Sequence, residues 1–475
     1  MQFKKYWFPL TVILLLLIYF FKAFSMSFFA DDFMFLEQSR VNTLSDVFHF
    51  FIPQQRFFRP VGTELLYALL YYPKSALLGH IITFIVFLIG IYFLYKILLK
   101  LTKNIILSRL TILIYIIHFT HVYQLYWLAT FQEVAMLAGL TVSLYFFINN
   151  KFSLSIILFI VSLLAKEQSI TFPLFVTLLM IFNSNFKTKK HLTALAVMTA
   201  IAAIAFYVHK VAISNFTFSP EYTVHLSPKL IVNNWIWHFL WSLGFPSIMP
   251  DYFVNLTSAP LTAFWNYFKN PVFALYIVIL LIYLTFLAIS TGLILTKKKD
   301  FSLVRIAVLS LVGFTIFLLP VLVIRHKWMV RLTLPLIFIS LFQSYIISLL
   351  LKNRGHFRYL GIFLMSLYFL WNFAGVKIHQ ETSTYNLETK ITNNATELFN
   401  ENRTEISEKG ILYIADTKQN GMSEWAGSKK LQITFAGQSF LDYYFRGENI
   451  KAFYGHETKI VPQKAFIINP EQLIH

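Results

Sequence analysis

Long apolar runs recur along this 475-residue chain, and they constrain its fold more than any other feature. A helix that crosses the hydrocarbon core of a bilayer needs about 20 mostly apolar residues. Charged residues make up only 13% of the chain, where soluble proteins carry about a quarter. We therefore predict a polytopic α-helical membrane protein with about eleven transmembrane helices, at residues 7–25, 77–98, 105–121, 133–148, 153–165, 169–183, 192–213, 272–296, 302–323, 332–351 and 359–376.

The basic residues indicate an orientation rather than a nucleic-acid partner. The formal net charge is +18, yet most lysines and arginines lie in short loops between apolar runs, as in the cytoplasmic loops of membrane proteins. With Lys4 and Lys5 in the cytoplasm, nearly all basic loop clusters fall on that side. The abundance of Phe, Ile and Lys is typical of an AT-rich genome and favours a bacterial plasma membrane. The absence of cysteine excludes disulfide and thiolate chemistry.

The same alternation assigns two large segments to the extracytoplasmic side. In the first outer loop, residues 26–76, the stretches FMFLEQ and LSDVFHFFI predict short amphipathic helices. In the tail, ETKITNNATELFNENR predicts a helix, and GILYIAD, KLQITFAG and KAFIINP predict strands. We expect a transmembrane domain over residues 1–376 and a small soluble α/β domain, outside the membrane, over residues 377–475.

Five groups of charged residues interrupt the apolar background, and the predicted topology places all five on the outer face. A charge at the membrane boundary is costly unless it faces a water-filled cavity, a cation or a substrate. Their convergence on one face therefore predicts a functional site there. In chain order, the groups are Asp31 and Asp32; Arg56, Arg59 and Glu64; Glu133; Lys166 and Glu167; and Arg325, His326, Lys327 and Arg331.

This mixture of side chains suits the transfer of a group away from a lipid phosphate. A carboxylate at the water boundary acts as a general base or holds a divalent cation. Arginine and lysine bind phosphate, arginine through a planar fork of donors. The base would deprotonate an acceptor hydroxyl, and the cations would stabilise the charge on the departing phosphate.

Each group taken alone also has a structural explanation. Aspartate is favoured at helix N-caps. Arg59, followed by Pro60, is compatible with an interfacial anchor at a helix start. Lys166–Glu167 is compatible with a self-neutralising turn, and the basic residues near 326 with side chains that reach toward the headgroups. His80, at the start of the second span, is more typical of a structural hydrogen bonder. The convergence of the five groups, rather than any one of them, favours a site.

The order of these motifs resembles the GT-C superfamily of membrane glycosyltransferases. The resemblance covers residues 1–376 and is strongest to the protein O-mannosyltransferase-like branch, which includes glycosyltransferase family 39 and the tetratricopeptide-bearing O-mannosyltransferases. The tail lacks a tetratricopeptide array, and RLTLP lacks the two tyrosines of the family's late Arg-Tyr-x-Tyr-x-Pro motif. The matching motifs are the acidic pair Asp31–Asp32, FRPV at 58–61, His80, QEVAML at 132–137, KEQSITFPL at 166–174 and RLTLP at 331–335.

The resemblance implies inverting transfer of a sugar from a polyprenyl-phosphate-linked donor to an acceptor hydroxyl outside the membrane. Asp31 would be the general base and Asp32 would assist it, and some relatives use a divalent cation, Mg or Mn, which these two aspartates would hold. The sugar hydroxyls or the bases would be oriented by Glu133, Glu167, His80 and His326. The donor phosphate would be bound by Arg59, Lys166, Arg325 and Arg331.

Two other classes of function use the same features. A transporter or flippase for a lipid-linked sugar would share a cationic outer site, although such proteins usually show internal repeats and a site near the bilayer midplane. A non-catalytic membrane scaffold would bind a partner through its tail. A transporter would release labelled donor unchanged, and a scaffold would tolerate neutral residues at Asp31, Arg59 and Arg331.

Overall fold

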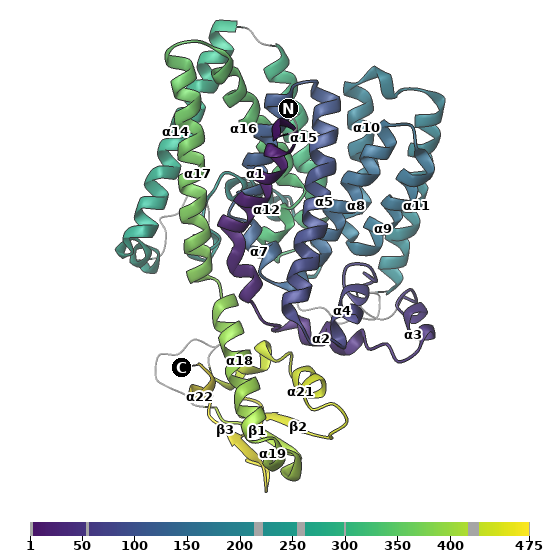
Figure 1. Cartoon of the computed structure of the whole chain (residues 1–475), viewed down its shortest axis with the longest axis vertical. Helices are drawn as coiled ribbons and strands as arrows, with labels where there is room; N and C mark the ends of the chain where they lie inside the picture. The colour runs from purple at the N-terminus through teal and green to yellow at the C-terminus, as the bar shows by residue number, and fades with distance from the viewer. Residues whose placement is uncertain are drawn as a thin grey trace.

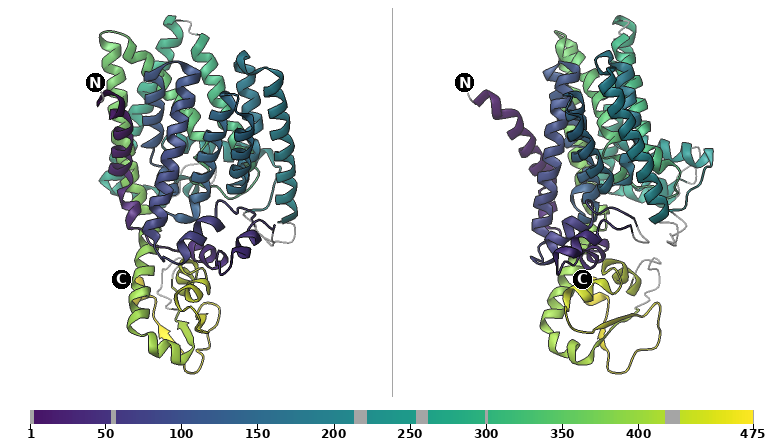
Figure 2. Two further views of the ribbon diagram at one scale, coloured as in Figure 1. Left: turned by 45° about the vertical axis from the view of Figure 1, so that its right-hand side comes forward. Right: turned by 90° about the vertical axis from the view of Figure 1, so that its right-hand side faces the viewer.

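A bundle of long helices makes up most of the molecule, and a smaller group of helices and strands lies beyond one end of it (Figure 1). This computed structural model describes residues 3–53, 57–212, 222–253, 262–298, 301–416 and 427–474. The N-terminus lies toward the opposite end of the bundle from the C-terminal group. In the side view, α1 leans away from the other helices toward its N-terminal end (Figure 2).

Within these described residues, eight helical segments are long and apolar enough to cross a membrane. They confirm a polytopic helical protein. The helices are α1 (Phe3–Phe20, continued by η1, Phe21–Ser25), α5 (Ala76–Thr102), α8 (Phe131–Ile148, preceded by η2, Leu128–Thr130), α11 (Lys189–Ala212), α14 (Pro271–Lys298), α15 (Phe301–Leu322), α16 (Pro335–Lys352) and α17 (His356–Thr382).

Three further predicted spans coincide with apolar helices that are shorter than a bilayer requires. The count of eleven transmembrane helices therefore stays a prediction. These helices are α6 (Ile105–Ile116), α9 (Phe152–Ala165) and α10 (Phe172–Phe182, preceded by η3, Glu167–Thr171).

The centre of the bundle is α8. Its span is 83% buried, whereas that of α11 is 22% buried, so α8 is covered by other helices and α11 faces outward. Helix α8 packs against α5 and α9, and α16 packs against α6, α15 and α17. The peripheral helices expose large apolar side chains, as expected for helices surrounded by lipid rather than water.

Short helices cluster at the end of the bundle that faces the C-terminal group. We call this the site end. Two of them, α2 (Asp31–Gln38) and α3 (Leu44–His49), confirm the predicted helices of the first loop, and α4 (Glu64–Tyr71) packs against α2. The others are α7 (His121–Leu125) and η7 (Met329–Leu332), and α12 (Pro228–Ser242) contacts η7. Figures 1 and 2 show α2 and α4 between the long helices and the C-terminal group.

The C-terminal group surrounds a three-stranded parallel sheet with the strand order β2-β1-β3. Tyr413 of β1 lies opposite Phe453 of β2 and Ile467 of β3. Its elements are α18 (Tyr385–Glu401), α19 (Arg403–Lys409), β1 (Ile411–Ile414), α20 (Ser428–Thr434), α21 (Ser439–Tyr444), β2 (Lys451–Tyr454), β3 (Phe466–Ile468) and α22 (Glu471–Ile474).

The tail prediction is correct for the helix and for the first and last strands, and wrong for KLQITFAG. That stretch forms α20, because Leu431, Thr434 and Phe435 follow a helical spacing and are buried on one face. The third strand of the sheet is instead β2, which pairs with β1 on the side opposite β3 and which the sequence analysis missed. Helix α17 continues to Thr382, so the chain leaves the bundle slightly later than the predicted boundary.

Small residues let α8 and α9 approach closely. A Cβ at Gly139 would lie 2.2 Å from the Ser162 hydroxyl oxygen. Ser143 and Ser155 donate hydroxyl hydrogen bonds to each other's backbone carbonyls, at 2.7 and 2.8 Å. Such small-residue contacts are a common way for membrane helices to associate.

We expect Gly139→Ala to destabilise the protein by about 1–3 kcal/mol, because the added methyl overlaps Ser162 in a packed interface. Adding Ser162→Ala should restore most of the loss. Thermal unfolding in detergent measures the effect. Gly292→Ala is the control, since nothing lies within 4 Å of a Cβ at that position. Equal melting temperatures for Gly139→Ala and Gly292→Ala would contradict this packing.

Candidate functional site

A tight turn presents the acidic pair at the site end. The Asp32 N–H donates to the Phe29 carbonyl at 3.1 Å, and Ala30 has φ 50° and ψ −126°. These values match the first central position of a type II′ turn, where glycine is the usual residue. A non-glycine residue in such a conformation costs about 1–3 kcal/mol and persists only where its surroundings hold it.

The two aspartates have different environments. Asp32 is fully buried, and its carboxylate accepts the Tyr67 hydroxyl at 2.5 Å and the Phe29 N–H at 3.0 Å. Asp31 is exposed to solvent, although its surroundings still desolvate the carboxylate. Burial raises the pKa of Asp32 to about 8, although hydrogen bonds from Tyr67, Phe29 and the Ala129 backbone lower it. Desolvation, helped by the negative Glu388 and opposed by Arg59, raises the pKa of Asp31 to about 6.

Neither aspartate acts as a helix cap. The N-cap of α2 is Ala30, and no side chain caps the helix there. Asp32 instead reaches back to the Phe29 N–H and closes the turn from the other side. Asp31 is thus the carboxylate that faces water, and Asp32 holds the turn that carries it.

Arg59 and Glu167 form a two-pronged ion pair next to this turn. The Arg59 Nε and Nη2 donate to the two carboxylate oxygens of Glu167, each at 2.7 Å. Close backbone packing makes the pair possible: the Val61 N–H donates to the Leu164 carbonyl at 3.0 Å, and a Cβ at Gly62 would lie 2.2 Å from the Ala165 carbonyl oxygen. Glycine at position 62 therefore lets the FRPV segment reach the Lys166–Glu167 turn.

Lys166 reaches a second carboxylate inside the bundle. Its ammonium lies 3.3 Å from Glu133 and donates to the Gln132 side-chain oxygen at 3.1 Å. The Glu133 side chain is only 1% exposed, so this carboxylate depends on Lys166 for its counter-charge. A buried charge is tolerated only when it is paired.

Arg331 completes the cluster from η7. It is buried, and its guanidinium donates to the His326 carbonyl at 2.8 Å and lies 3.2 Å from the His326 Nδ1. Burial, with Arg331 and Lys166 nearby, lowers the pKa of His326 to about 4, so its imidazole is neutral at pH 7. The neutral Nδ1 then accepts from Arg331, which leaves the proton on Nε2. No carboxylate of the described residues lies within ion-pair distance of Arg331.

Electrostatic interactions connect these pairs into one cluster. Arg59 acts on Asp31, on Glu167 and on Lys166, and Arg331 acts on Lys166 and on Glu133. The structure thus brings together residues from all five groups of the sequence, which lie up to 300 positions apart (331 minus 31).

Several predicted site residues lie outside this cluster. His80 is fully buried, with its Nδ1 3.1 Å from the Leu125 carbonyl, which is a structural contact. Arg325 is exposed, and Lys327 interacts with Asp251. Glu64 bonds to the Thr63 hydroxyl. Arg56 lies outside the residues that the structure describes.

The sequence analysis missed two residues near the aspartates, one from the tail and one from α4. Glu388 on α18 is close enough to Asp31 to act on it, and Glu388 pairs with Lys430 on α20. Tyr67, on α4, is the buried partner of Asp32. The sequence places Tyr67 in an apolar run and Glu388 in a polar helix, so neither stands out from its neighbours.

The acidic pair does not fit a divalent cation held between two open carboxylates. Asp32 uses both oxygens on Tyr67 and Phe29. In the parts of the chain that the structure describes, no group of three or more His, Cys, Asp or Glu side chains gathers as a metal site.

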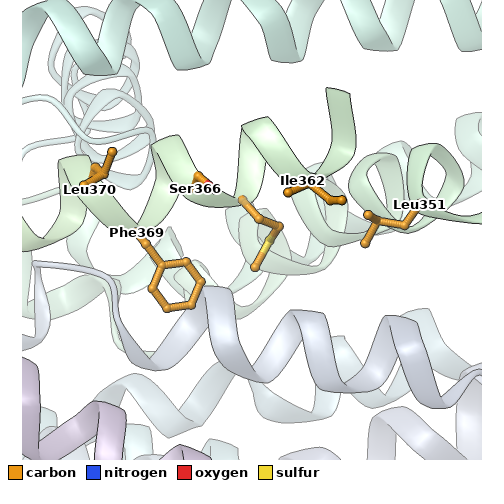
Figure 3. A pocket seen from close by; sticks show the side chains of 6 residues that line it. Leu351, Ile362, Ser366, Phe369 and Leu370 are labelled. Carbon is orange, nitrogen blue, oxygen red and sulfur yellow. The ribbon is translucent and has the colours of Figure 1, made fainter. Parts of the chain in front are cut away.

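Two surface hollows lie away from the cluster. One lies between α16 and α17 and is apolar apart from Ser366 (Figure 3). Its lining residues are Leu351, Ile362, Met365, Ser366, Phe369 and Leu370. Another, between α1 and α5, has a wholly apolar lining. Neither lining includes a charged side chain or an imidazole, so neither hollow is a candidate for acid–base catalysis.

Comparisons with protein-family models, with curated proteins and with solved structures find no match for this chain.

We expect Lys166→Met to destabilise the protein by about 3 kcal/mol, because it leaves the buried Glu133 carboxylate without a counter-charge. Adding Glu133→Gln should recover most of the loss. Thermal unfolding in detergent again gives the readout.

Lys409→Met is the matched control for Lys166→Met. It breaks an exposed pair with Glu405 on α19, and such pairs contribute at most about 1 kcal/mol. If Lys166→Met lowered the melting temperature no more than Lys409→Met does, Lys166 would not be the counter-charge of a buried carboxylate.

Proposed function

We propose that this chain is a membrane glycosyltransferase of GT-C type, which moves a sugar from a polyprenyl-phosphate-linked donor to an acceptor hydroxyl. The single observation that carries the proposal is the arrangement of the site end, where a solvent-facing carboxylate, Asp31, lies beside a buried group of cations. The cations are Arg59, Lys166 and Arg331.

The proposed reaction is a direct displacement with inversion. Asp31 takes the proton of the acceptor hydroxyl, and the acceptor oxygen bonds to the anomeric carbon. The bond from that carbon to the phosphate oxygen breaks on the opposite face, and the phosphate leaves with the electron pair. The cations stabilise the negative charge that it gains, which is often the largest contribution to catalysis.

Arg331 is our leading candidate for the phosphate contact. Arg59 is paired with Glu167 and Lys166 with Glu133, so Arg331 is the buried cation of the cluster that has no carboxylate within ion-pair distance among the described residues. Its contacts with His326 orient the guanidinium. A buried, oriented arginine without a carboxylate partner is well suited to an incoming phosphate.

The acidity of Asp31 supports its role as the base. With a pKa of about 6 it is mostly ionised at pH 7, and its basicity is close to the operating pH, which favours proton transfer. Asp32 has the higher pKa, and its two carboxylate oxygens accept hydrogen bonds from Tyr67 and Phe29. We therefore assign it the role of holding the turn that positions Asp31. Adjacent carboxylates with separated pKa values are a common arrangement in catalytic sites.

The location of the cluster favours an enzyme over a transporter. The charged residues gather at one end of the helices, where a headgroup phosphate lies, rather than at the midplane. We place this end on the extracytoplasmic side, with the tail as a soluble domain there and a bundle of about eleven transmembrane helices. A donor labelled in its sugar distinguishes the classes, because a transporter releases it intact and a transferase moves the label to the acceptor.

Asp31→Asn should lower sugar transfer by at least about 100-fold, because the amide cannot accept the acceptor's proton. The wild-type rate should rise with pH through about 6, as Asp31 ionises, with Arg59 and Glu388 as the charged groups that act on it and Asp32 still mostly protonated. The assay follows the labelled sugar from a purified polyprenyl-phosphate donor.

Asp46→Asn is the control for Asp31→Asn. Asp46 lies in the same loop, where it accepts N–H bonds from Asn42 and Thr43, which asparagine can also accept. The control should transfer sugar at the wild-type rate. Full transfer by Asp31→Asn would rule out the assigned base, and label recovered only in unchanged donor would favour a transporter.

Arg331→Lys should raise the donor KM by about tenfold, since a single ammonium replaces a planar fork of donors, and Arg331→Met should raise it further. Initial rates over a series of donor concentrations measure the change. Arg354→Met, an exposed position in the turn at the opposite end of the bundle, should leave the donor KM unaltered. A wild-type KM in Arg331→Met would show that the phosphate binds elsewhere.

A further inference from the structure

Two elements of the tail contact the irregular segment, residues 26–30, that leads into Asp31. On α18, the Thr389 hydroxyl accepts the Ser27 N–H at 3.3 Å, and the Asn393 side chain accepts the Ser27 hydroxyl at 2.6 Å. On α20, the Thr434 carbonyl accepts the Ala30 N–H at 2.7 Å. The tail therefore contacts the backbone of the chain on both sides of Phe29.

The bond from Ala30 to Thr434 holds the strained residue of the turn. Ala30 carries the positive φ that an alanine disfavours, so something outside the turn must maintain it. The other backbone contacts are local, from Asp32 to Phe29 and from Phe33 to Ala30. Of the backbone-to-backbone bonds of the turn, the one from α20 is long-range, and it comes from a segment about 400 residues later in the chain (434 minus 30).

A buried ion pair joins α18 to α20. Lys430, on α20, pairs with Glu388 on α18, and the two side chains are 13% and 6% exposed. Glu388 precedes Thr389, which accepts from Ser27, and Lys430 lies one helical turn before Thr434, which accepts from Ala30. The pair thus connects the two tail helices that bond to residues 26–30, α18 at Ser27 and α20 at Ala30.

Aromatic rings add to this grip. Phe29 packs against Tyr385 of α18 and against Trp127, with ring centroids 5.5 and 5.7 Å away, and these two rings also contact each other. The Trp127 indole N–H donates to the Phe29 carbonyl at 3.3 Å. Phe33, one turn into α2, packs against Phe440 of α21 at 4.6 Å. The turn is therefore enclosed by the tail on one side and by the bundle on the other.

We propose that the tail is a clamp that holds the Phe29–Asp32 turn in its observed conformation. Glu388 and Lys430 are then positioning residues, which act on Asp31 by fixing α18 and α20 relative to each other. The catalytic consequence rests on the proposed function; the clamp itself does not. The site is incomplete without residues 385–474, so the tail is part of the catalytic unit.

Cross-linking tests the clamp directly. The chain contains no cysteine, so Ser27→Cys with Asn393→Cys introduces the only two thiols, at positions whose side chains now share a hydrogen bond. In detergent, a short bifunctional thiol reagent should join them rapidly. Lys430→Met or Glu388→Gln in this background should slow the cross-linking several-fold, and Lys430→Arg, which keeps the charge, should restore it.

Lys409→Met is the matched control, because it breaks an ion pair of the same tail that lies on the surface of α19. It should cross-link as fast as the parent. Thr389→Val provides a second route, since it removes only the hydroxyl that accepts the Ser27 N–H. If Lys430→Met does not fold, the cross-linking rate of Thr389→Val shows whether the tail holds the turn.

Sugar transfer provides the second readout, measured in the chain without added cysteines. Lys430→Met should lower kcat by about 10–100-fold, because a small displacement of a reacting group is costly, and the donor KM should stay at the wild-type value. Lys430→Arg should recover the rate. A lesion of the phosphate site would instead change the donor KM.

The two readouts separate the possible outcomes. Slower cross-linking with Lys430→Met and Glu388→Gln, but not with Lys409→Met, supports the clamp. Parent cross-linking rates in Lys430→Met, Glu388→Gln and Thr389→Val overturn it. If even the wild-type chain transfers no sugar, the proposed function fails, and the cross-linking rates still decide whether the tail holds the turn.

Discussion

The structure of the site end depends on one constraint, which is that charges buried beside a membrane must be paired. Lys166 and Glu133 illustrate it, since the carboxylate is almost inaccessible to water and the ammonium is its counter-charge. A buried ion pair is weak evidence for stability, because desolvation opposes the attraction. The cluster therefore has a cost, and hydrophobic residues would fill the same space at least as well. Such a cost is most easily understood where the charges serve a function.

The two adjacent aspartates show how the surroundings give one residue type two roles. Asp32 points inward and closes the turn, whereas Asp31 faces water next to Arg59. The turn itself requires this division, because consecutive side chains at the start of a helix point in different directions. A pair of acidic residues in sequence is thus not a pair in space, which is why the structure gives little support to a cation held between them.

Sequence reasoning found what depends on local composition and missed what depends on distant contacts. Apolar runs are recognisable one at a time, and unusual charges at their ends, such as Arg59 and Lys166, stand out against them. The type II′ turn was not predictable, because its strained position holds Ala30 rather than glycine and is maintained by a contact with Thr434. The sequence predicts a strand where α20 forms because Ile433 and Thr434 are β-branched, although burial follows a helical spacing.

The cations and the base of the proposed site are held by different parts of the chain. The cations belong to the bundle, where Lys166 follows the end of α9 and Arg59 lies in the loop that packs against it at Gly62. The base belongs to a turn that the tail grips from outside, through α18 and α20. In the proposed reaction, the bundle cations would bind the phosphate, and the acceptor would approach the turn that the tail holds. The attachment of a distinct C-terminal group to a charged bundle end then has a physical reason.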